Sequence, residues 1–75
     1  MDDAARGDVL LQTLGEREAA ERALRLTLRE FEQTYGPADP RLAAPLSALG
    51  VLCQLRGDLD AAEQCYRRVI RLSMP

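Results

Sequence analysis

The hydrophobic residues of this chain recur at helical spacing in several separate stretches. Between 41 and 56, apolar residues follow one another at steps of three and four positions, which is the period of an amphipathic helix. The same spacing continues through 59–73, and it is present again in the N-terminal part of the chain, on both sides of Gly15. The pattern predicts an all-α fold with about four helices. The apolar residues that carry it are Val9, Leu10, Leu11, Leu14, Ala20, Ala23, Leu24, Leu28, Phe31, Leu42, Leu46, Leu49, Leu52, Cys53, Leu55, Leu59, Ala62, Tyr66, Val69 and Ile70.

Two glycines interrupt these stretches at equivalent places. Gly57 breaks the apolar run in the segment Leu-Arg-Gly-Asp, and Asp58 or Asp60 can cap the helix that follows, since aspartate is a favoured N-cap residue. Gly15 breaks the N-terminal run in the same way, so the second helix there is expected at roughly 16–35. Each glycine therefore predicts a turn between two helices.

The segment 36–40 is predicted to be a linker between two pairs of helices. Gly36 can adopt the left-handed conformation that ends a helix, and Pro37 prevents the helix from resuming. Asp39 suits the N-cap position and Pro40 suits the first helical position of the next helix. Pro45 then falls about one turn further on, which leaves open either a tolerated first-turn proline with a late helix start or a functional bend.

The chain matches itself when it is shifted by 42 residues. Residues 8–33 then lie over residues 50–75, and nine of these 26 positions are identical. The match predicts one domain built from two similar helical hairpins, at about 3–35 and about 41–73, joined by the linker and packed as antiparallel neighbours. The identical pairs are Val9 and Val51, Leu10 and Leu52, Gln12 and Gln54, Gly15 and Gly57, Ala19 and Ala61, Ala20 and Ala62, Glu21 and Glu63, Arg25 and Arg67, and Arg29 and Arg71.

In these features the chain resembles the tetratricopeptide repeats, and in particular the 42-residue variety of kinesin light chains and nephrocystin-3. The linker is similar to the Gly-Pro-Asp-His-Pro loop of that subfamily, although Ala38 and Asp39 replace its Asp and His. The resemblance implies antiparallel hairpins stacked as a short solenoid, in which small residues permit close helix packing and a concave groove receives a partner. The residues of the second copy that carry the signature are Leu49, Gly50, Gly57, Leu59, Ala62, Tyr66 and Val69.

In such a solenoid the groove is lined by the first helix of each hairpin. The candidates here include no Lys, Asn or Arg, which disfavours a clamp for the C-terminal carboxylate of a chaperone peptide. Their mixture of apolar and amide side chains suits an amphipathic helix or an extended peptide with apolar anchors. The groove candidates are Val9, Gln12, Thr13, Ser47, Val51, Gln54 and Leu55.

The last helix predicts a second contact surface. Repeat arrays usually finish with a polar capping helix, whereas the helix at about 59–73 is apolar on one side and has no following helix in this sequence. Exposed patches of this kind mark contact sites, so we expect a homodimer or a neighbouring repeat there. The candidate residues for self-association are Tyr66, Val69, Ile70 and Leu72.

Composition and charge argue against catalysis and against nucleic acid. The net charge is −2, histidine is absent, and aromatic residues make up 4% of the chain, so a basic or base-stacking surface is not expected. Without histidine, neither Cys53 nor Cys65 has an obvious activating base, and both are expected to be structural thiols. All ten basic residues are arginines, which reflects either coding bias or an arginine-rich contact face. We expect no catalytic residues, no cofactor and no metal.

The sequence therefore predicts a non-catalytic protein–protein interaction module, an adaptor or scaffold fragment. The alternative is a small docking or regulatory segment that tethers or assembles an enzyme complex. The chain contains no apolar run long enough to span a membrane and does not begin with a secretory signal, so a cytoplasmic location is expected.

Overall fold

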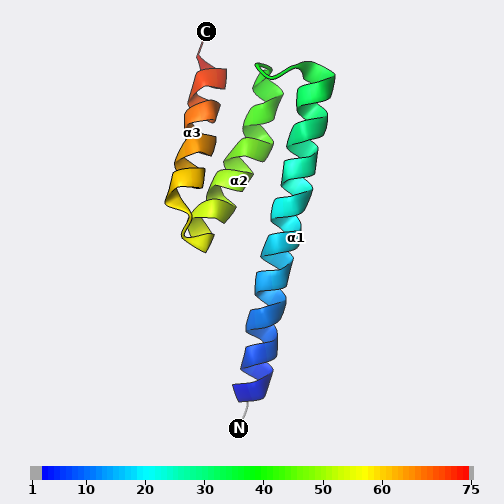
Figure 1. Ribbon diagram of the computed structural model, residues 1–75, viewed down its shortest axis with the longest axis vertical. Coiled ribbons are helices and arrows are strands. Elements are labelled where there is room, and N and C mark those ends of the chain that lie inside the picture. The colour runs from blue at the N-terminus through cyan, green and yellow to red at the C-terminus, as the bar shows by residue number, and fades with distance from the viewer. Residues whose placement is uncertain (1–2, 75) are drawn as a thin grey trace.

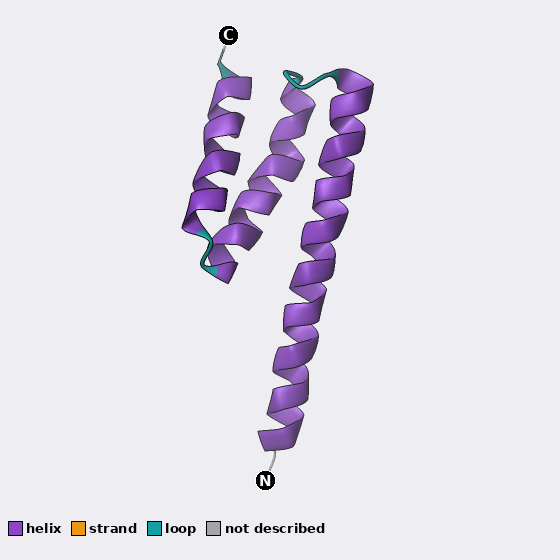
Figure 2. Ribbon diagram, in the orientation of Figure 1, coloured by secondary structure: helices purple, strands orange, loops and turns teal. Residues whose placement is uncertain are grey.

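The computed structural model describes the backbone of residues 3–74 and the side chains of residue 12 and of residues 14–74. Over this range the chain is helical and contains no strand, which confirms the predicted all-α class. None of the helices in this range is long and apolar enough to cross a bilayer. The elements in chain order are α1 (Asp3–Tyr35), the short 3-10 helix η1 (Pro40–Leu42), α2 (Ala43–Arg56) and α3 (Leu59–Ser73). Figures 1 and 2 show how the α-helices lie side by side.

The N-terminal part of the fold differs from the prediction. α1 is a single helix of 33 residues that passes through Gly15 without a break, so the described residues contain three α-helices and one hairpin rather than about four helices and two hairpins. The predicted turn at Gly15 is wrong because a glycine alone does not end a helix. Glu16 follows it where the second copy has Asp58, and glutamate favours the helix interior over the N-cap.

The turn between α2 and α3 forms as predicted. Gly57 adopts a left-handed conformation with φ of 89°, and its N–H donates to the carbonyl of Gln54 at 3.0 Å. Asp58, and not Asp60, is the N-cap of α3, and its carboxylate accepts a hydrogen bond from the N–H of Ala61 at 3.2 Å. These local contacts reverse the chain and hold α2 and α3 antiparallel.

The linker after α1 also follows its sequence signals. Gly36 ends α1 with φ of 90°, and the carboxylate of Asp39 accepts a hydrogen bond from the N–H of Arg41 at 2.9 Å. Pro40 opens the 3-10 helix η1, so α2 begins late, at Ala43. Pro45 consequently lies in the first turn of α2, where its missing N–H disrupts no helical hydrogen bond.

The core is centred on α2, which lies between α1 and α3 (Figure 1). Leu42, Leu49 and Cys53 are fully buried, and Leu46 and Ala62 are nearly so. Charged contacts at the C-terminal end of α1 attach it to the rest of the fold: Arg68 donates to Glu32 at 3.0 Å, and the guanidinium of Arg41 lies 4.2 Å above the centre of the Tyr35 ring. The N-terminal half of α1 projects beyond this core, and the described chain measures 57 × 23 × 13 Å (Figure 1).

Candidate functional site

The four groove candidates of α2 share one face of that helix, which we call the α2 outer face: Ser47, Val51, Gln54 and Leu55. Because the opposite side of α2 faces the core, Val51 and Leu55 remain 49% and 55% exposed. Gln54 is exposed and its side-chain oxygen accepts a hydrogen bond from the Tyr66 hydroxyl at 3.4 Å, while Ser47 is partly buried. The structure therefore brings these four residues together as a mixed apolar and polar strip.

The groove candidates of α1 lie on the projecting half of that helix. Gln12 is exposed and donates to the carboxylate of Glu16 at 3.4 Å, a contact within α1. The side chains of Val9 and Thr13 lie outside the described residues. Since α1 does not turn at Gly15, this part of the chain is not folded back beside the α2 outer face.

A groove forms instead where α1 passes the C-terminal end of α2, and we call it the α1–α2 groove. Its volume is about 200 Å³, and its floor is apolar. Leu55 belongs both to this groove and to the α2 outer face, so the two surfaces are continuous. Sequence reasoning did not find this groove, because its shape depends on α1 running straight. Its lining residues are Leu14, Arg17, Glu18, Glu21, Leu52, Leu55 and Arg56.

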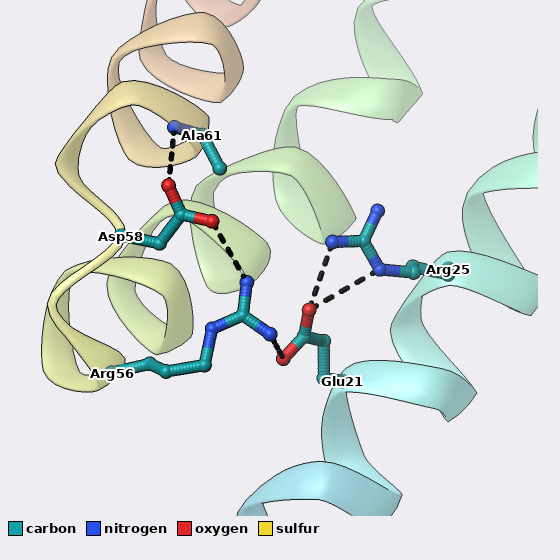
Figure 3. A network of polar contacts seen from close by, with 5 residues as sticks. All are labelled: Glu21, Arg25, Arg56, Asp58 and Ala61. Carbon is teal, nitrogen blue, oxygen red and sulfur yellow. Dashed lines mark hydrogen bonds and ion pairs between the residues drawn. The ribbon is translucent and has the colours of Figure 1, made fainter.

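Charged side chains close one side of this groove and join α1 to the α2–α3 turn (Figure 3). The carboxylate of Glu21 accepts from Arg25 at 2.8 Å and from Arg56 at 3.1 Å, and Arg56 also donates to Asp58 at 3.1 Å. Glu21 is 9% exposed, which makes it the one charged residue among the buried residues of the described side chains. Its hydrogen bond raises the pKa of the Arg25 guanidinium above the usual value.

The candidates for self-association on α3 divide between two sites. Tyr66 and Ile70 line a shallow groove of about 420 Å³, the α3 groove, in which Ile70 is 56% exposed. Leu72 lies away from it, beside the linker residues Pro37 and Ala38, and Val69 is partly buried. The structure adds Leu59, an exposed member of the predicted apolar stripe of α3, to the first site. The α3 groove is lined by Gln54, Leu59, Ala62, Glu63, Tyr66, Arg67 and Ile70.

Comparison with known families decides what these helices are. A sequence model described as the tetratricopeptide repeat matches residues 4–73, which is almost the whole chain. The chain belongs to the tetratricopeptide repeat family. Its members generally act as protein–protein interaction modules. Comparisons with curated proteins and with solved structures gave no match.

Within the tetratricopeptide repeat the two helices of a hairpin pack closely, and α2 and α3 show how. A Cβ atom added to Gly50 would lie 2.7 Å from a ring carbon of Tyr66, closer than atoms can approach without movement. Gly50 and Tyr66 stand at the small and large positions of the repeat signature. The α2–α3 hairpin therefore has the close helix packing of a tetratricopeptide repeat, and the C-terminal half of α1 aligns with α3 in the 42-residue register.

The two cysteines of the repeat lie on its facing helices. Cys53 is fully buried in α2, and Cys65 is partly buried in α3. Burial raises the pKa of the Cys65 thiol, which favours the unreactive protonated form at neutral pH. This environment suits a packing role. Among the described side chains, no three His, Cys, Asp or Glu residues cluster as metal ligands would.

Proposed function

We propose that this chain is a non-catalytic adaptor or scaffold module that holds a segment of another protein on the α2 outer face and in the adjoining α1–α2 groove. The observation that carries the proposal is the exposed pair Val51 and Leu55, one helical turn apart, beside an apolar groove. Isolated exposed leucines are common, but an exposed apolar pair that continues into an apolar groove marks a contact surface. The general role of the tetratricopeptide family in protein interactions supports it.

The partner segment that suits this surface is an amphipathic helix with apolar anchors. An anchor spacing of three or four residues matches the spacing of Val51 and Leu55, and the Gln54 amide offers a hydrogen bond between them. Glu21 and Arg56 at the groove wall are already paired with each other at 3.1 Å. The surface therefore recognises apolar side chains more than charges.

Affinity capture with the full chain tests this assignment. We expect a partner captured by the unaltered chain to be lost from the double variant Val51→Glu/Gln54→Arg, and its Kd measured by calorimetry to rise by at least about tenfold, because an unpaired charge would be buried. The matched control is Leu26→Glu/Gln33→Arg, which changes two exposed residues of α1 by the same charges. If both double variants bind as the unaltered chain does, the α2 surface is not the binding site.

A second mode, self-association or stacking of a further repeat on the α3 groove, is favoured by the exposure of Leu59 and Ile70. In this mode the groove takes the first helix of a following repeat, which extends the solenoid. Ile70→Glu is expected to abolish it without changing capture on the α2 outer face. A docking segment for an enzyme complex would use the same surfaces, and the identity of the captured partner separates it from an adaptor.

The finer family assignment and the location belong to the same proposal. The 42-residue spacing of the two copies and the linker 36–40 support membership of the kinesin-light-chain and nephrocystin-3 variety. A cytoplasmic location agrees with two free cysteines, since oxidising compartments favour disulfides.

A further inference from the structure

The two sequence copies adopt different structures, and the difference leaves one helix face uncovered. In the second copy, α2 turns at Gly57 and packs on α3, so Ala62 is only 4% exposed. In the first copy the chain runs straight, and Ala20, the residue equivalent to Ala62, is exposed. The equivalent face of α1 also includes Ala23, which is exposed, and Leu24 and Thr27, which are partly buried, and we call these four residues the open α1 face.

The segment that would cover this face is present in the chain but points away from it. Residues 3–14 correspond in the 42-residue register to most of α2, and they carry the apolar residues Val9, Leu10, Leu11 and Leu14. Figure 1 shows that this half of α1 extends past the ends of α2 and α3. A straight helix cannot fold onto its own second half, so the segment cannot reach the open α1 face of the same chain.

We propose that two copies of the chain form a two-fold dimer in which residues 3–14 of each copy cover the open α1 face of the other. The two α1 helices then run antiparallel and cross near Gly15. Each copy thereby receives the helix that its first repeat lacks, and both copies use the same surface, as a two-fold interface requires.

The register of the second repeat fixes how the helices meet. There Gly50 lies against Tyr66, and a shift of 42 residues places Asp8 against Leu24. The side-chain sizes of the pair change in opposite senses: the residue opposite the smaller leucine carries a side chain, whereas the residue opposite the larger tyrosine has none. The midpoint between positions 8 and 24 is residue 16. The symmetry axis of the dimer therefore passes beside residues 15 and 16, where the first copy lacks the turn of the second.

The residues around Gly15 explain why the segment 3–14 packs on a second copy instead of closing a hairpin within its own chain. In the second copy Asp58 caps α3 through the N–H of Ala61 at 3.2 Å, whereas Glu16 takes that place in the first copy. Glutamate is a weaker N-cap and a better interior helix residue than aspartate. An interior glycine weakens a helix, but the closed turn also lacks the aspartate cap of the second copy. With the turn uncapped, the chain stays extended at Gly15 and finds the missing contact in a second copy.

The open α1 face shares no residue with the α2 outer face or with the α3 groove. The exchanged segment 3–14 meets the proposed binding surface only at Leu14, which also lines the α1–α2 groove. A partner on the α2 outer face and the exchanged dimer can therefore be tested independently.

Light scattering coupled to size-exclusion chromatography of the full chain, over a range of concentrations, tests the dimer. We expect a molar mass twice that of one chain, which falls to the mass of one chain on dilution. Ala20→Glu is expected to give a monomer at every concentration, because it places a charge in the exchanged interface. Leu26→Glu, on another side of α1 and also exposed in the single chain, is expected to stay dimeric. Circular dichroism checks that both variants keep their helix.

Two hinge variants test the exchange itself. Glu16→Asp improves the cap of the closed turn and is expected to raise the dimer Kd by roughly fivefold for each of the two hinges. Gly15→Ala strengthens the straight helix and is expected to lower the Kd by a similar factor. A monomer at all concentrations, or a dimer abolished by Ile70→Glu but insensitive to Ala20→Glu and to both hinge variants, would overturn the proposal.

Discussion

At the scale of single residues, the buried Glu21 is the clearest test of how the charged contacts contribute. We expect Glu21→Gln to lower the free energy of unfolding by about 1–2 kcal/mol, because it removes the charge of a side chain that is 12% exposed and pairs with two arginines. Glu63→Gln is the matched control, since Glu63 is the equivalent residue of the second repeat and pairs with Arg67 at 2.6 Å on the exposed surface. The free energy of unfolding is expected to fall by less than about 0.5 kcal/mol in this control variant. Urea denaturation measures both, and equal losses would contradict a special role for Glu21.

The thiol of Cys65 is expected to react more slowly in the folded chain than in the unfolded chain. Burial raises the pKa of Cys65 in the folded state above the value of 9.0 for a free thiol, so the neutral form is favoured. The resulting stabilisation is present below pH 9 and is lost as the pH rises through the folded-state pKa. In a Cys53→Ala variant, alkylation of Cys65 by iodoacetamide, followed by mass spectrometry, should therefore be slower at pH 8 than alkylation of the urea-unfolded chain. Equal rates would show that Cys65 is not shielded.

At the scale of elements, the close approach of α2 and α3 depends on the pair Gly50 and Tyr66. Gly50→Ala is expected to cost about 1–2 kcal/mol, because the clash of the new methyl group with the ring outweighs the gain in helix propensity. With Tyr66→Leu as the background, the same substitution should become neutral or stabilising by up to about 1 kcal/mol. A double-mutant cycle from urea denaturation measures this coupling. A cost that is unchanged in the leucine background would show that Tyr66 is not the obstacle.

The elements that the sequence predicted correctly are those whose ends are set by local residues. Gly36 and Gly57 both adopt the left-handed conformation, and Asp39 and Asp58 both accept capping hydrogen bonds. The prediction failed at Gly15, where a glycine without a following aspartate cap stays helical. Helix ends are thus predictable where two signals agree, and less so where a glycine stands alone.

The candidate site was predictable only in part, for a similar reason. The exposed residues of the α2 outer face follow from helical periodicity within one element. The contact of Glu21 with Arg56 spans 35 residues, and the α1–α2 groove depends on the path of α1, so neither is visible in a local pattern. Tertiary arrangement, rather than residue type, decides such features.

At the scale of the whole molecule, the straight α1 makes the chain unusually extended. The Cα radius of gyration of 15.3 Å exceeds the value of about 11 Å expected for a compact chain of this length. If the sequence at residues 14–16 is what keeps α1 straight, then Leu14→Arg/Glu16→Asp, which copies the Arg-Gly-Asp turn of residues 56–58, should close the first hairpin. We expect the radius of the monomer to fall from near the extended value toward the compact one. Small-angle scattering of the monomer peak from a chromatography column measures this change, with Gly15→Ala as the control that should remain extended.

A double variant as extended as the control would mean that the turn residues do not govern the path of α1, and that contacts elsewhere keep the helix straight.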